Sequence, residues 1–269
     1  MIANSGLLSR SIINLVNLRQ GMLSISNLPP SAQGIQQTAA GILADDEIIL
    51  KELQSQILSF TTTVEPVIDM VIATMQSGRI SPQEIKVVED INIQAKGIRD
   101  FVQVKSFALN ASKEQIISLQ NSLLTIRNTL QADINNLSVE IDSANREVES
   151  LNQRKYYLIA LGPFGLVGLA AIIGLLVTWN NNINDLKSRS SNFEIQITML
   201  NSLINNIDSM MGNFNTAVGL VSNIKNSTDF LSSDITVVIG DLQDAEGKLA
   251  LVYMMAASQQ VKTLATDAS

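Results

Sequence analysis

Residues 156–179 read YYLIALGPFGLVGLAAIIGLLVTW, an apolar run interrupted by the turn signature Gly-Pro-Phe-Gly at 162–165. The run belongs to a longer stretch without any charged residue, 29 positions from Tyr156 to Asn184. Its length matches that of a transmembrane helix, which needs about 20 apolar residues. The stretch therefore predicts either one membrane-spanning helix or a hairpin that enters a membrane and returns.

The position of the turn favours the hairpin. About six apolar residues precede the turn and about fourteen follow it, and fourteen helical residues reach only roughly 21 Å, short of the ~30 Å hydrocarbon core of a bilayer. A hairpin of this size would enter one leaflet. A third interpretation, a buried core helix of a soluble bundle, is less favoured because few other elements of the chain could cover a run at the far end of two long helices.

Three apolar series flank this run with the alternating spacing of three and four residues that is typical of coiled coils. The first series, with one slip in spacing, is Ile116, Leu119, Leu123, Ile126, Leu130, Ile134, Leu137, Ile141, Ala144, Val148 and Leu151. The second is Ile183, Leu186, Ser190, Phe193, Ile197, Leu200, Ile204, Ile207, Met211, Phe214, Val218 and Val221. The third is Leu231, Ile235, Val238, Leu242, Ala245, Leu249, Val252 and Ala256. These series predict packed helical seams.

Proline and capping residues set the expected helix boundaries. The sequence Ser81-Pro82-Gln83-Glu84 is a capping box with proline at the first helical position, and no further proline follows until Pro163. One helix of about 80 residues is therefore expected from Pro82, roughly 120 Å long. Shorter helices are expected near 5–20, 31–60 and 64–77, separated by Pro29-Pro30 and by Pro66, and the residues 226–229 are expected to form a turn before the third series.

The predicted fold is all-α: an elongated bundle of about five helices, with two very long antiparallel coiled-coil helices and a hydrophobic hairpin head at one end. Residues 1–155 and 180–269 would form the helical tail bundle. Residues 156–179 would form the membrane-interacting head.

Composition excludes several classes of function. The chain has no His and no Cys, which removes the commonest general base and metal ligand as well as every thiol. The net charge of −7 argues against binding to nucleic acid. The carboxylate cluster Asp45-Asp46-Glu47 is more typical of the first turn of a helix or a solvated face than of a catalytic site. We expect no enzyme activity, no metal and no cofactor.

The candidate site is the head itself, with three groups of residues. The expected membrane-inserting residues are Tyr156, Tyr157, Leu158, Ile159, Leu161, Pro163, Phe164, Leu166, Val167, Leu169, Ile172, Ile173, Leu175, Leu176, Val177 and Trp179. Arg154 and Lys155 lie just outside the run and suit lipid headgroups, as the aromatic residues at its ends suit the membrane interface. Gly162, Gly165, Gly168 and Gly174 are expected as turn or hinge positions of the head.

Two very long helices joined by an uncharged Gly/Pro-containing tip resemble the α-pore-forming toxins of the cytolysin A type, in layout rather than in any short motif. The chain is shorter and its head smaller than those of self-sufficient pore formers, so it looks more like the small C-type component of the tripartite Ahl/Smh-like toxins. The soluble form of such a protein must hide its head, either by folding it down or by packing heads together in a homo-oligomer. The resemblance implies a secreted protein that is soluble before it meets the target-cell membrane. It also implies binding to one leaflet and cooperation with other toxin components to form a lytic pore.

Two alternatives share the same seams and apolar tip. One is a secretion-system translocator or a similar membrane-inserted coiled-coil protein. The other is a structural coiled-coil oligomer whose tip is an interface between subunits, and this one would not bind lipid.

Overall fold

The computed structural model describes residues 6–78, 81–160, 166–244 and 247–269, and it describes only the backbone of residues 157–160 and 166–170. The described residues form helices and no strand, so the predicted all-α fold is confirmed.

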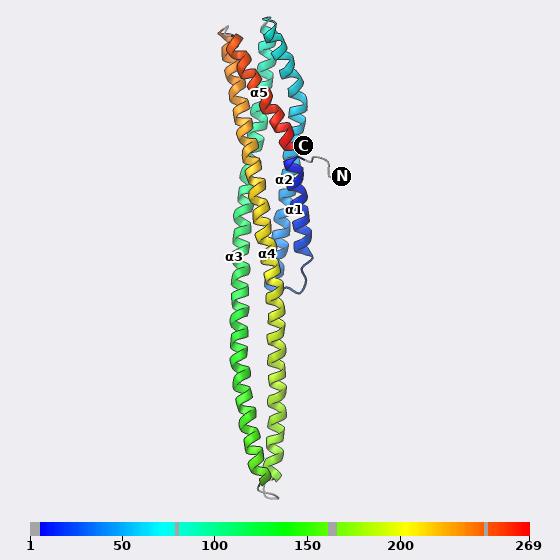
Figure 1. Ribbon diagram of the computed structural model, residues 1–269, viewed down its shortest axis with the longest axis vertical. Helices are drawn as coiled ribbons and strands as arrows, with labels where there is room; N and C mark the ends of the chain where they lie inside the picture. The colour runs from blue at the N-terminus through cyan, green and yellow to red at the C-terminus, as the bar shows by residue number, and fades with distance from the viewer. Residues whose placement is uncertain (1–5, 79–80, 161–165, 245–246) are drawn as a thin grey trace. The chain divides into compact units, whose positions relative to one another are not determined.

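Five helices follow one another along the described chain, coloured from blue to red in Figure 1. They are α1 (Leu7–Leu23), α2 (Pro30–Gln76), α3 (Pro82–Ala160), α4 (Leu166–Gln243) and α5 (Gly247–Ala268). Helices α3 and α4 contain 79 and 78 residues, so the two very long helices predicted on either side of the Gly-Pro turn are both present.

The chain divides into two compact units. Unit 1 comprises Met1–Ser24, Gln37–Leu119 and Asn206–Ser269, and unit 2 comprises Ile25–Gln36 and Gln120–Asn205. Each of the helices α2, α3 and α4 contributes residues to both units.

Unit 1 has an aliphatic core to which all five helices contribute. Its fully buried side chains include Leu15 of α1, Leu50 of α2, Leu109 of α3, Phe214 of α4 and Met254 of α5. Each lies in a series of buried residues spaced by three, four or seven positions, which places one apolar face of every helix toward this core.

Hydrogen bonds from side chains also connect the helices of unit 1. Thr236 Oγ1 of α4 donates to Asn92 Oδ1 of α3 at 3.4 Å, and Ser258 Oγ of α5 donates to Asp69 Oδ1 of α2 at 3.2 Å. Gln54 Nε2 of α2 donates to the carbonyl oxygen of Ala268 at 2.8 Å, which attaches the end of α5 to α2.

Unit 2 is built on the paired segments of α3 and α4. The buried residues of α3 are Leu123, Leu137, Ala144 and Leu151, and those of α4 are Leu176, Ile183, Leu200, Leu203 and Ile204. The segment of α3 around Ala144 lies against the segment of α4 around Asn182, with the two helices antiparallel. Most of these buried positions fall on the two predicted series, except Leu176, which precedes the second series, and Leu203, which lies beside it. No member of either series is exposed.

The N-terminus of α3 forms the predicted capping box. The Ser81 backbone N–H donates to Glu84 Oε2 at 2.8 Å, and the Gln83 backbone N–H donates to Ser81 Oγ at 3.2 Å. The hydrogen bond from the Ser81 hydroxyl is the main reason that the pKa of Glu84 lies below its ordinary value.

Two predicted helix breaks are wrong. Helix α2 continues through Pro66, which is exposed, so the carbonyl that loses its N–H partner can bind water while Val64 and Ile68 stay buried on the opposite face. Helix α4 continues through 226–229: Thr228 is fully buried and its hydroxyl donates to the Lys225 carbonyl at 2.7 Å, so the helix itself satisfies the expected capping residue.

The third apolar series is only partly a seam. Leu231, Ile235, Val238 and Leu242 are buried at the end of α4, whereas Leu249, Val252 and Ala256 of α5 are exposed. Helix α4 ends at Gln243 and α5 is a separate helix that begins at Gly247. The face that α5 buries is a different one, formed by Ala250, Met254, Ala257, Val261 and Leu264. Ala245 lies outside the described residues.

Replacing Ser81 with Ala should lower the free energy of unfolding of the chain by about 1 kcal/mol, because the first turn of α3 loses its side-chain cap. Urea denaturation followed by circular dichroism measures this change. Ser138→Ala, in the exposed interior of α3, is the matched control and should be neutral or slightly stabilising. Equal effects of the two substitutions would contradict a capping role for Ser81.

Candidate functional site

The predicted head occupies the end of α3 and the beginning of α4, within unit 2. Helix α3 ends at Ala160 and α4 begins at Leu166, so the two helices run to either side of the Gly-Pro-Phe-Gly sequence. Several predicted site residues lie outside the described residues, either completely or as side chains: Tyr157, Leu158, Ile159, Leu161, Gly162, Pro163, Phe164, Gly165, Leu166, Val167 and Leu169.

The described apolar residues of the head fall into two groups. Tyr156 is 71% exposed, and Ile173, Leu175 and Val177 are about half exposed, at 45%, 49% and 55%. Leu176 is buried.

Ile172 and Trp179 are partly buried. With Leu176 they are spaced by four and then three residues, which continues the second apolar series toward the turn. The predicted inserting residues therefore include both exposed side chains and an inward-facing seam.

The charged residues and the glycines of the head also differ in their surroundings. Arg154 is exposed and Lys155 is half-buried, one helical turn before the end of α3. Gly168 and Gly174 lie inside α4, and their role as hinge positions of the head stays a prediction. A Cβ atom built on Gly174 would have open space around it, which shows that no neighbouring helix of unit 2 needs glycine there.

A second apolar segment was not singled out from the sequence. Among the described residues, α2 alone is long and apolar enough to cross a membrane by length and composition, with a mean hydropathy of 1.3 over its most apolar 18 residues. A third of that window is buried, and the same helix carries much of the unit 1 core. Its composition is therefore also that of a core helix in a soluble bundle.

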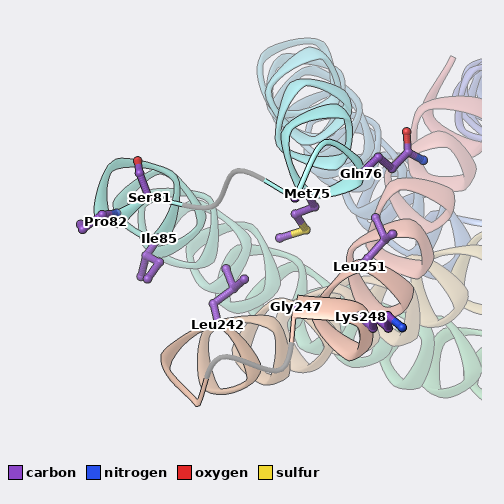
Figure 2. A pocket seen from close by; sticks show the side chains of 10 residues that line it. Met75, Gln76, Ser81, Pro82, Ile85, Leu242, Gly247, Lys248 and Leu251 are labelled. Atoms are coloured by element: carbon purple, nitrogen blue, oxygen red, sulfur yellow. The ribbon is translucent and has the colours of Figure 1, made fainter.

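A cavity of about 650 Å³ lies in unit 1 where the ends of α2 and α4 meet the beginnings of α3 and α5 (Figure 2). Figure 2 shows Met75 and Leu242 reaching into the space between these helix ends. Lys248 is the one charged residue in the described lining of this cavity.

One residue of the carboxylate cluster 45–47, Asp46, belongs to the core of unit 1, so the expected first-turn or solvated position is wrong for this residue, whereas Asp45 is exposed. Asp46 lies in the middle of α2, is fully buried, and accepts a hydrogen bond from Ser112 Oγ of α3 at 2.8 Å. Glu47 lies beside it and pairs with Lys51 at 2.6 Å and with Arg19 of α1 at 3.3 Å.

Burial raises the pKa of Asp46 to about 7, against the opposing effect of the Ser112 hydrogen bond. Its Oδ2 atom makes no hydrogen bond within the described part of the chain. A buried acid with a pKa near 7 carries less negative charge at neutral pH than an ordinary aspartate, which is compatible with a packed core. No group of three or more possible metal ligands occurs among the described residues.

Comparison with known proteins connects this arrangement to a class. No family model and no curated protein sequence matches the chain. Among solved structures it is similar to soluble AhlC of the tripartite alpha-pore-forming toxin AHL from Aeromonas hydrophila, at 28% identity over 98% of both chains with a TM-score of 0.83.

Two further structures support the same fold. The soluble AhlC triple head mutant matches at 28% identity over 98% of both chains with a TM-score of 0.85. The SmhB pore of the tripartite toxin Smh from Serratia marcescens matches at 14% identity, over 96% of this chain and 97% of that chain, with a TM-score of 0.58.

The chain therefore has the fold of the α-pore-forming toxin components, and the resemblance inferred from its sequence is confirmed. Within that class it is similar in sequence as well as in fold to AhlC, over almost the whole of both chains.

Replacing Asp46 with Asn should stabilise the chain in a pH-dependent manner. Below pH about 4 the carboxyl is protonated in both the folded and the unfolded states, so the two proteins should be equally stable. Between pH about 4 and 7 the unfolded state loses its proton first, and the wild type should lose roughly 2–4 kcal/mol relative to the variant. Urea denaturation at pH 4, 6 and 8 measures this difference, and a variant that is less stable at pH 8 would contradict the prediction.

Proposed function

We propose that this chain is the small, C-type component of a multi-protein α-pore-forming toxin, which binds target membranes through its head and recruits partner subunits to form a lytic pore. The observation that carries the proposal is the similarity to AhlC over 98% of both chains, combined with the uncharged run at the α3–α4 connection. The description of one AhlC variant as a head mutant supports assigning a head to this fold.

Residues 156–179 act as the head in this proposal, and residues 1–155 and 180–269 act as the tail. The exposed side chains of Tyr156, Ile173, Leu175 and Val177 would transfer from water to lipid, which contributes roughly 25 cal/mol per Å² of apolar surface. Arg154 and Lys155 would remain among the headgroups. The seam residues Ile172, Leu176 and Trp179 would hold the two helices together as the tip enters one leaflet.

Before membrane contact the head needs another apolar partner, since an exposed patch of this kind promotes association. A homo-oligomer that buries the heads together satisfies this need and agrees with a secreted protein that is soluble until it meets a target cell. Lipid then competes with the neighbouring heads for the same side chains.

The chain acts by binding and assembly and not as an enzyme in this proposal. The absence of His and Cys from its sequence and the lining of the cavity in Figure 2 support this assignment. Neither the head nor the tail requires a cofactor.

Replacing Ile173 with Asp should reduce liposome flotation at least tenfold, because a carboxylate on the inserting face must be desolvated or protonated to enter lipid. Leu169→Asp should have the same effect. Helicity measured by circular dichroism should not change.

Ile195→Asp provides the matched control for this test. Ile195 lies on the same helix and is 49% exposed, close to the 45% of Ile173, but it falls outside the head. It should float with liposomes as the wild type does. Unchanged flotation of the Ile173→Asp variant would contradict the proposed role of the head in membrane binding.

Dye release separates binding from lysis. The chain alone should bind liposomes without releasing an encapsulated dye, because fourteen helical residues after the turn are too short to span the bilayer. Adding the two larger components of the same toxin should cause release. Complete release by the chain alone would show that it forms pores without partners.

A further inference from the structure

A surface groove of about 400 Å³ lies beside the seam of unit 2, near the proposed head. Its lining residues are Glu140, Ser143 and Ala144 of α3 with Trp179, Asn182, Asp185 and Leu186 of α4. All seven are described residues of the same unit. The groove therefore combines one aromatic side chain, two carboxylates, two neutral polar groups and an aliphatic floor.

We propose that this groove binds the trimethylammonium group of a choline lipid headgroup. The inference rests on the proposed function, since it names the lipid chemistry that the membrane-binding head recognises.

The two carboxylates and the aromatic side chain of the groove favour a cationic ligand. Glu140 and Asp185 are exposed, and neither carboxylate makes an ion pair with any described residue. Trp179 is only partly buried, and it is one of the residues that line the groove. A quaternary ammonium held over an indole face and beside carboxylates is the arrangement by which choline is recognised.

Other ligands fit the lining less well. A lipid phosphate would meet two carboxylates and no lysine or arginine among the described lining residues. A calcium ion needs six or more oxygen ligands, which two carboxylates and two neutral polar side chains do not readily supply. A trimethylammonium group has no N–H groups to satisfy, and its methyl groups suit the indole and the side chains of Ala144 and Leu186.

The position of Trp179 along α4 agrees with the depth of a headgroup. Trp179 lies 13 residues after Leu166, the first residue of α4, which corresponds to about 20 Å along the helix. One leaflet contributes about 15 Å to the hydrocarbon core. A tip inserted into one leaflet therefore brings Trp179 and the groove to the level of the headgroups.

The first experiment uses the single tryptophan of the chain as its own probe. Titration of the purified protein with phosphocholine should produce a saturable change in Trp179 fluorescence that sodium chloride at equal ionic strength does not produce. The double variant Glu140→Gln/Asp185→Asn should bind phosphocholine roughly tenfold more weakly, since the carboxylates that attract the ammonium are gone.

Glu147→Gln/Glu194→Gln is the matched control. Both residues are exposed glutamates on the same two helices of unit 2, outside the groove, so the change in net charge is identical. This variant should bind phosphocholine as the wild type does. Equal weakening of both double variants, or no saturable response in the wild type, would overturn the site.

The second experiment identifies the lipid. The protein should float with vesicles of dioleoylphosphatidylcholine at least tenfold more efficiently than with vesicles of digalactosyldiacylglycerol, which are uncharged and carry no ammonium. The Glu140→Gln/Asp185→Asn variant should lose this preference, and the control variant should retain it.

The possible results separate the groove from the proposed function. Equal flotation with both lipids would overturn the choline site and leave membrane binding intact. The protein could also float with neither lipid and still bind phosphocholine normally. That result would show that a lipid is not the ligand, and it would overturn the proposed function as well.

Discussion

The antiparallel seam between α3 and α4 is the interaction on which the rest of the chain depends. In unit 2 it supplies most of the buried surface, because the paired segments of α3 and α4 have little else to pack against there. Its members alternate by three and four residues, so each helix presents one continuous stripe to the other. The same two helices contribute to the core of unit 1, where Leu109 and Phe214 are fully buried among residues of α1, α2 and α5. A seam of this kind specifies shape and places the turn between the helices at one end.

That constraint also decides which surfaces of the two long helices stay exposed. A helix that packs through one stripe leaves its other faces free, and near the turn these faces carry Ile173, Leu175 and Val177. Farther along the seam, Trp179 and the small residue Ala144 line a groove together with the carboxylates of Glu140 and Asp185. Both the exposed apolar residues and the carboxylate-lined groove follow from this helical packing. The apolar residues lie on surfaces that point away from the seam, and the groove lies beside the seam.

Several features were predictable because they depend on residues close together in sequence. The capping box at Ser81 and the stripes on α3 and α4 follow from local spacing, and the structure contains both. The breaks expected at Pro66 and at 226–229 were wrong because both are weak local signals. A proline inside a helix removes one backbone hydrogen bond, and burial of the flanking apolar residues outweighs that loss. A buried threonine can satisfy its hydroxyl by a hydrogen bond within its own helix, so it does not end the helix.

The sequence by itself determined the helical period, the two long helices and the uncharged tip between them, because each follows from the spacing and charge of neighbouring residues. Only the tertiary structure decided which residues face one another. Asp46 looked like a solvated carboxylate until α3 placed Ser112 against it and its surroundings excluded water. The sequence marked Trp179 as an interfacial aromatic residue, and only the pairing of α3 with α4 shows that it lines a groove together with Glu140. Residues that are distant in sequence meet through the register of helix pairing, which sets burial and pKa and which no local pattern contains.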